Sequence, residues 1–250
     1  SINDVVNSVV KFLDDVDPNI EPVTTGSPTI PIDSLNPIQL QPYGYYAEFK
    51  PKPSEKTQLW AGNLNKYNLR NGELVDKNLQ RLILSTGALN KDAVGLWTNG
   101  VKGQLPLGTL VAANGEQNSK RKVFTNRVIK QDKTAVSGDR LAQVSLLSLF
   151  AENNEIAKFK YDADKNYWLN FLGYDVGIAE NIASLGDLTS KEYRELGSVM
   201  HSTPIMLTQE GKITVADGKL TTTGRKDYLM FGSTQGALHV VDDEGKEVFA

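Results

Sequence analysis

Apolar and polar residues alternate in short blocks over the last part of the chain. Each polar block ends in glycine, which a type I turn that continues into a left-handed residue requires. Strand, turn, strand, turn and strand at this spacing predict an antiparallel meander, the unit from which β-propeller blades are built. We expect the third strand to be cut short at Ala250, so that the chain is the front part of a larger protein. The apolar runs are 228–231, 237–241 and 248–250, and the polar tetrads are 233–236 and 242–245.

The N-terminal residues follow a different period. Apolar side chains recur at steps of three and four, which predicts one amphipathic helix over residues 1–16, with Ser1 as its N-cap. Proline at position 18 ends this helix, because proline disfavours helical geometry in the residue before it. So short a helix must dock on another surface. It either packs on the domain that follows or ends a domain upstream, and we favour the second.

Residues 17–42 contain a proline about every five positions among polar residues, which is typical of an extended linker. The remainder, 43–250, is poor in helical periodicity. We therefore expect a mainly β fold, the opening part of a β-propeller-like domain made of antiparallel meanders, with an N-terminal helix and a small helical insert. The domain organisation is a helix over 1–16, a linker over 17–42, and the front of a propeller over 43–250.

Aromatic, alternating patterns predict strands over 43–49 and 58–69. Asn71-Gly72 then predicts a hairpin turn, because this dipeptide accepts the left-handed geometry that such turns need. The segment 164–195 breaks the strand pattern: a short helix is expected near Trp168, and a second helical or irregular insert follows over 178–194. Further strands are predicted near 94–98, 107–113, 121–130 and 140–150.

Composition fits an exported β-rich protein. The chain has 250 residues, enough for a sizeable core, and its net charge of −3 comes from interspersed acids and bases. Such a distribution gives no field that would gather nucleic acid or anionic lipid. With no cysteine, disulfides and thiolate chemistry are excluded. No apolar run approaches the ~18 residues of a membrane helix, so no membrane span is expected. Any signal peptide would lie upstream of Ser1.

Candidate catalytic residues are few. His201 and His239 could bind a metal or act as general bases, but we interpret both as structural, with ring nitrogens bonded to neighbouring backbone. His239 shares a face of its strand with Ala237 and Val241, which favours a half-buried imidazole. The chain has neither a Gly-x-Ser-x-Gly motif nor a phosphate-binding glycine loop. The sequence therefore indicates no catalytic or cofactor-binding residue.

One spacing suits a metal. Asp162, Asp164 and Asn166 place oxygen side chains at alternating positions, as at the start of a calcium loop. Tyr167 stands where that loop needs glycine, and no glutamate follows six residues later. We keep these three residues as weak metal candidates beside the interpretation that they form an ordinary polar turn.

A basic cluster occupies 120–130, where Lys120, Arg121, Lys122, Arg127 and Lys130 lie close in sequence. It could contact nucleic acid or an anionic surface. Strand alternation would divide its members between two faces, with acidic residues nearby. We therefore interpret it as a solvated face, with no specific nucleic-acid site.

Five segments resemble, in the same order, segments of the large type IV pilus biogenesis factors and tip adhesins. Residues 59–69 are similar to that family's tryptophan-glycine-asparagine-leucine-lysine-lysine-tyrosine segment. Residues 121–125 resemble its arginine-x-valine-tyrosine/phenylalanine-threonine strand. Residues 168–173 resemble a segment that ends in arginine-glycine, although Leu172 stands in place of the arginine.

Two further segments complete the resemblance, which covers 43–250. Residues 196–204 resemble leucine-glycine-aspartate-isoleucine-valine-histidine-serine-serine/threonine-proline, with Ser198 in place of the aspartate. Residues 231–239 resemble glycine-alanine-asparagine-aspartate-glycine-methionine-leucine-histidine. The residues that carry the family pattern, which we interpret as structural, are Trp60, Gly62, Asn63, Leu64, Tyr67, Arg121, His201, Pro204, Gly236 and His239.

The resemblance implies a protein at the bacterial cell surface, at a pilus tip, or in the outer membrane or periplasm. It implies that the helix and linker over 1–42 lie between an upstream von Willebrand factor A-like domain and a C-terminal β-propeller, which this chain begins. It implies a non-enzymatic role in pilus assembly and surface adhesion, with minor pilins or the pilus tip and a host or abiotic surface as partners. It implies no cofactor in this segment, and calcium only in a part C-terminal to Ala250. The alternative is a periplasmic quinoprotein-type β-propeller, either a scaffold or a dehydrogenase.

Overall fold

The computed structural model describes residues 28–38, 40–50, 60–108, 119–188, 193–200 and 202–250. Over these residues, strands and isolated bridges make up 40% and helices 10%, so the protein is mainly β, as expected. Its three sheets are all antiparallel, and none of them closes into a barrel or propeller. The helix predicted over 1–16 and most of the linker lie outside the described residues.

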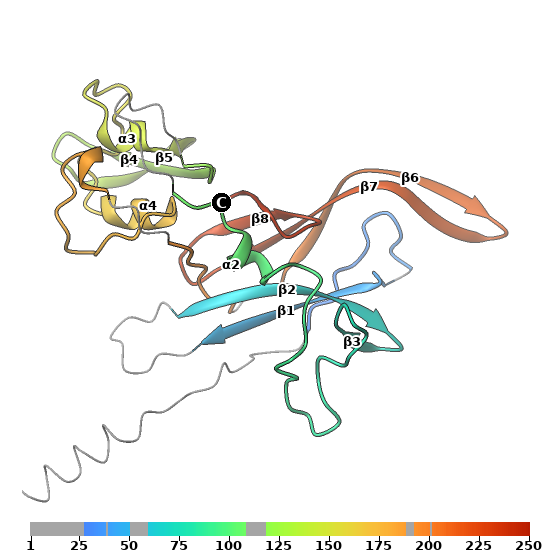
Figure 1. The fold of residues 1–250 in the computed structure, drawn as a ribbon. Helices are drawn as coiled ribbons and strands as arrows, with labels where there is room; N and C mark the ends of the chain where they lie inside the picture. The colour runs from blue at the N-terminus through green and yellow to red at the C-terminus, as the bar shows by residue number, and fades with distance from the viewer. Residues whose placement is uncertain (1–27, 39, 51–59, 109–118, 189–192, 201) are drawn as a thin grey trace, which may run out of the picture.

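The first sheet holds three strands in the order β1-β2-β3 (Figure 1). The turn between β2 and β3 has positive φ at both Asn71 (51°) and Gly72 (80°), which confirms the predicted hairpin. A short helix, α2 (Gly100–Gln104), lies against β2. The strands are β1 (Tyr43–Lys50), β2 (Ala61–Arg70) and β3 (Glu73–Val75).

The second sheet is a single hairpin, β4-β5, with small helices beside it. Its elements are β4 (Val123–Ile129), β5 (Ala135–Val144), α3 (Leu146–Phe150), α4 (Lys165–Phe171) and the 3-10 helix η1 (Leu185–Asp187). α4 and η1 fall within the predicted helical insert. Leu169 and Phe171 of α4 are buried, and they join a core built from Val123, Val144 and Leu149.

The third sheet is a four-stranded meander in the order β6-β7-β8-β9. Its last three strands are those predicted from the alternation over 228–250, and the glycines that close their turns, Gly236 and Gly245, have φ of 75° and 81°. β6 and β7 form a long hairpin whose far end extends away from the rest of the protein (Figure 1). The strands are β6 (Ile205–Ala216), β7 (Lys219–Gly232), β8 (Leu238–Asp242) and β9 (Glu247–Phe249).

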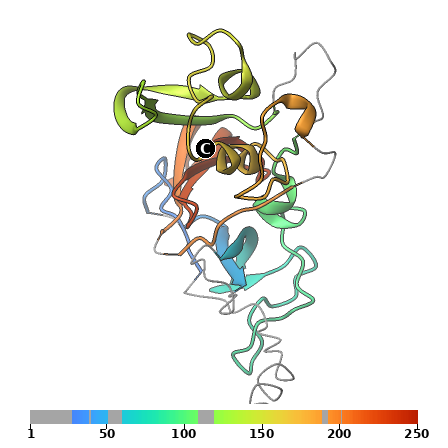
Figure 2. The same ribbon diagram turned by 90° about the vertical axis from the view of Figure 1, so that its left-hand side faces the viewer.

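The third sheet lies between the other two, as Figures 1 and 2 both show. Side chains from β1, β2, β7 and β8 form one core with the loop that leads into α2. On the other side, Ala250 exchanges backbone hydrogen bonds with the segment that enters β4: Phe124 N–H donates to Ala250 O (2.8 Å), and Ala250 N–H donates to Lys122 O (3.0 Å). The last strand, which we expected to be cut short at Ala250, therefore has the entry to β4 as its neighbour at that residue.

Other expectations also need correction. Residues 94–98 form no strand; they are irregular and bent, and Asn65 holds them, because its side chain accepts a hydrogen bond from Trp97 N–H (3.2 Å). Residues 107–108 are not in a strand, and 109–113 lie outside the described residues. The apolar run after β5 is the helix α3, because Ser145 and Ser148 form a capping box. The strand β6 was not predicted at all.

Candidate functional site

The five family-like segments, spread over 59–239, meet in space. β2 is bridged to the fourth segment: Gly62 N–H donates to Leu196 O (2.7 Å), and Ser198 N–H donates to Trp60 O (2.9 Å). This contact requires glycine, since a β-carbon on Gly62 would lie 2.4 Å from the Cα of Ser198. Trp60 itself stacks on Phe49 with ring centroids 5.5 Å apart.

The fourth segment is joined in turn to the fifth. Thr234 N–H donates to Ser198 O (2.9 Å), and Gly197 N–H donates to the side-chain oxygen of Gln235 (3.0 Å). A β-carbon on Gly197 would lie 2.7 Å from the backbone nitrogen of Gln235, so this position also requires the absence of a side chain. Gly232 N–H donates to Ser202 Oγ (2.7 Å). The turn between β7 and β8 is thus held against Gly197, Ser198 and Ser202.

His239 connects this turn to β9. Its Nε2 lies 2.8 Å from Ser233 Oγ, and its Nδ1 lies 2.8 Å from Glu247 Oε1. The ring stacks between Phe231 (5.2 Å) and Phe171 (6.1 Å). We expected a half-buried imidazole bonded to backbone; instead the side chain is 0% exposed and its partners are side chains.

Arg121 completes the chain of contacts. Its Nε and Nη2 donate to the two carboxylate oxygens of Glu247 (2.6 and 2.9 Å), and its Nη1 donates to Phe171 O (2.7 Å). The guanidinium carbon also lies 4.2 Å from the centre of the Phe171 ring. The side chains of Arg121 and Glu247 are 2% and 1% exposed. Arg121, which lies in the second family-like segment, therefore contacts the third segment directly at Phe171. It is linked to His239 of the fifth segment through Glu247.

The electrostatics of this buried group keep Glu247 ionised. Burial raises the pKa of its carboxyl, but hydrogen bonds from His239 and Arg121 and the positive charge of Arg121 lower it by more. The pKa of Glu247 consequently lies below its ordinary value of 4.5. A buried carboxylate with one bidentate cation and an imidazole has its lone pairs satisfied, which is the condition for burying such a charge.

The hydrogen bonds from Ser233 to His239 and from His239 to Glu247 connect the same residue types as a catalytic nucleophile, general base and orienting carboxylate. Here the imidazole lies between two aromatic rings with no exposed surface through which to exchange a proton with a substrate. The carboxylate is also held by Arg121 on both oxygens. We interpret the network as a structural link among β8, β9, α4 and the entry to β4.

The weak metal candidates make other contacts. Asp162 and Asp164 both pair with Arg127 (2.8 and 2.6 Å), and Trp168 Nε1 donates to the second oxygen of Asp162 (2.9 Å). Asn166 donates its amide to the carbonyls of the 177–180 loop. Burial lowers the pKa of Arg127, but its two carboxylate partners raise it by more. No group of three or more metal-ligating side chains occurs within the described residues.

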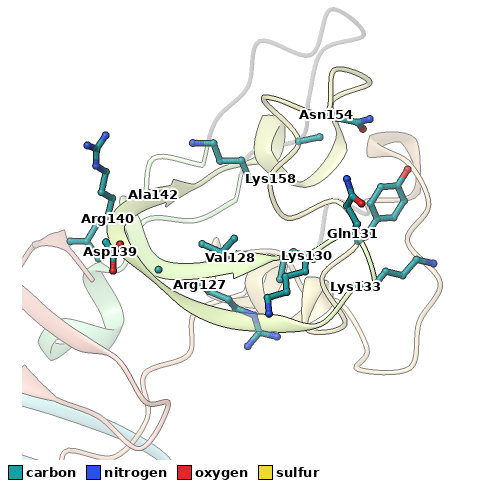
Figure 3. Close-up of a pocket in the computed structure, with 15 residues that line it drawn as sticks. Arg127, Val128, Lys130, Gln131, Lys133, Asp139, Arg140, Ala142, Asn154 and Lys158 are labelled. Atoms are coloured by element: carbon teal, nitrogen blue, oxygen red, sulfur yellow. The ribbon is translucent and has the colours of Figure 1, made fainter.

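The basic cluster over 120–130 is divided by the fold. Arg121 is buried in its ion pair, which corrects its assignment to a solvated face, and Lys120 and Lys122 are exposed at the entry to β4. Arg127 and Lys130 line an open groove of about 930 Å³ beside β4 and β5 (Figure 3).

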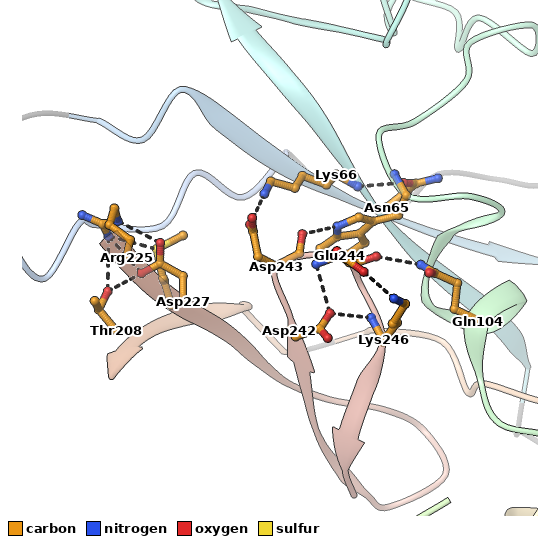
Figure 4. A network of polar contacts seen from close by, with 12 residues as sticks. Asn65, Lys66, Gln104, Thr208, Arg225, Asp227, Asp242, Asp243, Glu244 and Lys246 are labelled. Atoms are coloured by element: carbon orange, nitrogen blue, oxygen red, sulfur yellow. Dashed lines mark hydrogen bonds and ion pairs between the residues drawn. The ribbon is translucent and has the colours of Figure 1, made fainter. Parts of the chain in front are cut away.

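A polar network lies on the side of the third sheet that faces the first sheet (Figure 4). Arg225 of β7 pairs with Asp227 and with Asp33 of the N-terminal loop, through contacts of 2.8 to 3.0 Å. Lys66 of β2 pairs with Asp243, although the Lys66 side chain is only 6% exposed. Both of these cations are paired, Arg225 with two carboxylates and Lys66 with one, and the network attaches β2 and the loop around Asp33 to the third sheet.

The remaining family-pattern residues occupy structural positions. Leu64 and Tyr67 are buried on opposite faces of β2, Asn63 Oδ1 accepts from Lys102 N–H (3.0 Å), and Pro204 is buried before β6. Gly236 closes a turn, and His201 lies outside the described residues. The sequence analysis missed Glu247. This residue follows an acidic turn, and nothing in the local sequence distinguishes it from the solvent-exposed acidic residues there.

No protein-family model, curated protein or solved structure matches this chain. In the part of the chain that is described, no helix is both long and apolar enough to cross a bilayer.

Proposed function

We propose that this chain is a non-enzymatic type IV pilus-associated protein that acts in pilus assembly and in surface adhesion at the pilus tip. On this proposal, β6–β9 is one blade of a β-propeller, since a four-stranded antiparallel meander is the form that such a blade takes. Its partners are minor pilins or the pilus tip and a host or abiotic surface, and it acts outside the cytoplasm.

One observation supports the proposal most. The five segments that resemble the pilus family were chosen by residue pattern alone, yet they contact one another through Gly62, Ser198, His239 and Arg121. Segments that matched by chance would have no reason to share one set of buried contacts. The five segments are thus connected in space through a few of their residues and Glu247, as the framework segments of one family would be.

His239 is fully buried, so this residue is not an accessible base. The test is deletion of the gene in the source bacterium, with an epitope-tagged copy located by immuno-electron microscopy. We expect fewer surface pili, reduced adhesion, and label at pilus tips. Unchanged piliation and adhesion, with label confined to the periplasm, would contradict the proposal and favour the periplasmic propeller.

A further inference from the structure

The groove beside β4 and β5 is strongly basic. β4, β5, the turn between them and the loop after α3 contribute cations that line an open groove of about 930 Å³, and their side chains point in several directions around it (Figure 3). A single carboxylate, Asp139, lies among them. The cationic residues that line the groove are Arg127, Lys130, Lys133, Arg140 and Lys158.

Most of this charge is uncompensated. Of the five cations only Arg127 makes an ion pair, counted over the described residues, and its partners are Asp162 and Asp164. The other four lie together in a chain whose net charge is −3. Like charges gathered along one groove repel one another, and an anionic ligand would relieve that repulsion.

The groove also offers neutral groups. The amides of Gln131 and Asn154 line it, and the ring of Tyr161 is 56% exposed at its wall, with Lys133 Nζ 5.7 Å from the ring centre. Amides and the carboxylate of Asp139 exchange hydrogen bonds with hydroxyl groups. An exposed aromatic ring supplies a flat apolar face for a sugar ring.

We propose that this groove binds an acidic polysaccharide, a chain of sugars that carries sulfate or carboxylate groups. The carboxylate of Asp139 and the amides of Gln131 and Asn154 can exchange hydrogen bonds with the hydroxyl groups of sugars, which the backbone of DNA lacks. Single-stranded nucleic acid is usually bound by successive aromatic rings, and among the lining residues Tyr161 is the sole aromatic.

An acidic polysaccharide would be the surface component that the proposed adhesin binds, so its biological role rests on the proposed function. Binding by the purified chain does not depend on pili, so the two proposals can fail separately. The probe is a fluorescein-labelled heparin oligosaccharide, titrated with protein at several salt concentrations, with labelled oligothymidylate in parallel. We expect the oligosaccharide to bind more tightly than the DNA, and its affinity to fall with salt.

The test variant combines Lys130→Gln, Arg140→Gln and Lys158→Gln. The matched control removes the same charge from exposed sites outside the groove, with Lys77→Gln, Lys219→Gln and Lys226→Gln. We expect the groove variant to bind roughly tenfold or more weakly, and the control to bind within about twofold of the parent protein. All six positions are exposed, so folding should persist, and circular dichroism checks this.

A second variant separates shape from charge. Tyr161→Ala leaves the net charge unchanged and should weaken heparin binding, whereas Tyr161→Phe should retain it. Equal loss of affinity in the groove and control variants would overturn the inference, because it would indicate general charge attraction. Tighter binding of oligothymidylate than of heparin would overturn it in favour of a nucleic-acid site.

Discussion

The guanidinium of Arg121 and the carboxylate of Glu247, 126 residues apart in sequence, form a buried bidentate ion pair with contacts of 2.6 and 2.9 Å. The pair joins the segment that enters β4 to β9. Because Glu247 also bonds to His239, loss of Glu247 would remove a hydrogen-bond partner from both Arg121 and His239. Loss of Arg121 would leave Glu247 without its cation.

Removal of one partner should be strongly destabilising. Arg121→Met leaves Glu247 as a buried carboxylate without its cation, so we expect a loss of about 3–5 kcal/mol in the free energy of unfolding. Urea denaturation measures this loss. Arg81→Met breaks the exposed pair with Glu73, where the side chains are 53% and 48% exposed, and should cost about 0–1 kcal/mol. Equal effects of the two substitutions would show that burial of the first pair is unimportant.

The same pair predicts the response to acid. The pKa of Glu247 is lower in the folded protein than its ordinary value of 4.5, so the unfolded state binds a proton at higher pH. Its contribution to stability is therefore complete above the ordinary pKa and is lost as pH falls through the folded pKa. Unfolding free energies measured from about pH 6 to about pH 3 should fall less steeply for Glu247→Gln than for the parent protein. Parallel curves would contradict this assignment.

The close approach of β2 to the fourth family-like segment should not tolerate a side chain. Gly62→Ala places a methyl group 2.4 Å from the Cα of Ser198, so the backbones must separate. We expect a loss on the order of 1–3 kcal/mol, together with faster hydrogen exchange at Ser198. Gly186→Ala is the control, because its nearest neighbour would be Ser184 Oγ at 3.6 Å. Similar stabilities for the two variants would refute the steric reason.

The serine, histidine and glutamate network should be inert in hydrolysis. Ser233→Ala removes one hydrogen bond to His239 and should reduce stability by about 1 kcal/mol. Release of p-nitrophenol from p-nitrophenyl acetate should be the same with and without this substitution. Turnover that depends on Ser233 would mean that His239 becomes accessible and would overturn the structural interpretation.

Calcium should not stabilise the chain through the 162–166 turn. Arg127 already pairs with Asp162 and Asp164, and the turn lacks the glycine and glutamate of a calcium loop. Thermal unfolding should give the same melting temperature with and without added calcium. A rise in melting temperature that disappears in Asp164→Ala would identify a site at this turn.

Strong local signals predicted much of the fold. Asn71-Gly72 gave the first hairpin, and the alternation over 228–250 gave three strands of the third sheet. β6 was missed because its hairpin with β7 is exposed on both faces over much of its length, so no buried face imposes an apolar alternation. The remaining signal was Asp217-Gly218, whose φ angles of 51° and 71° form the turn.

The site was predicted only in part. Arg121 and His239 were singled out by resemblance, but nothing local to either residue indicates that Glu247 would lie between them. Such a pairing depends on the packing of β9 beside the entry to β4. Likewise, we predicted a strand that included the 146–150 run, which is the helix α3, because so short an apolar run fits both periods.

The separation of Arg121 and Glu247 along the chain sets a delay during synthesis. At ribosomal rates, the 126 residues between them take roughly 6–25 s to make, and until then the arginine lacks its carboxylate partner. The hydrophobic core beside β4 and β5 can assemble in this interval, but its attachment to the third sheet cannot. The position of Glu247 near the end of the sequence therefore sets an order of assembly. The β4–β5 unit can attach to the third sheet only after β9 has been synthesised.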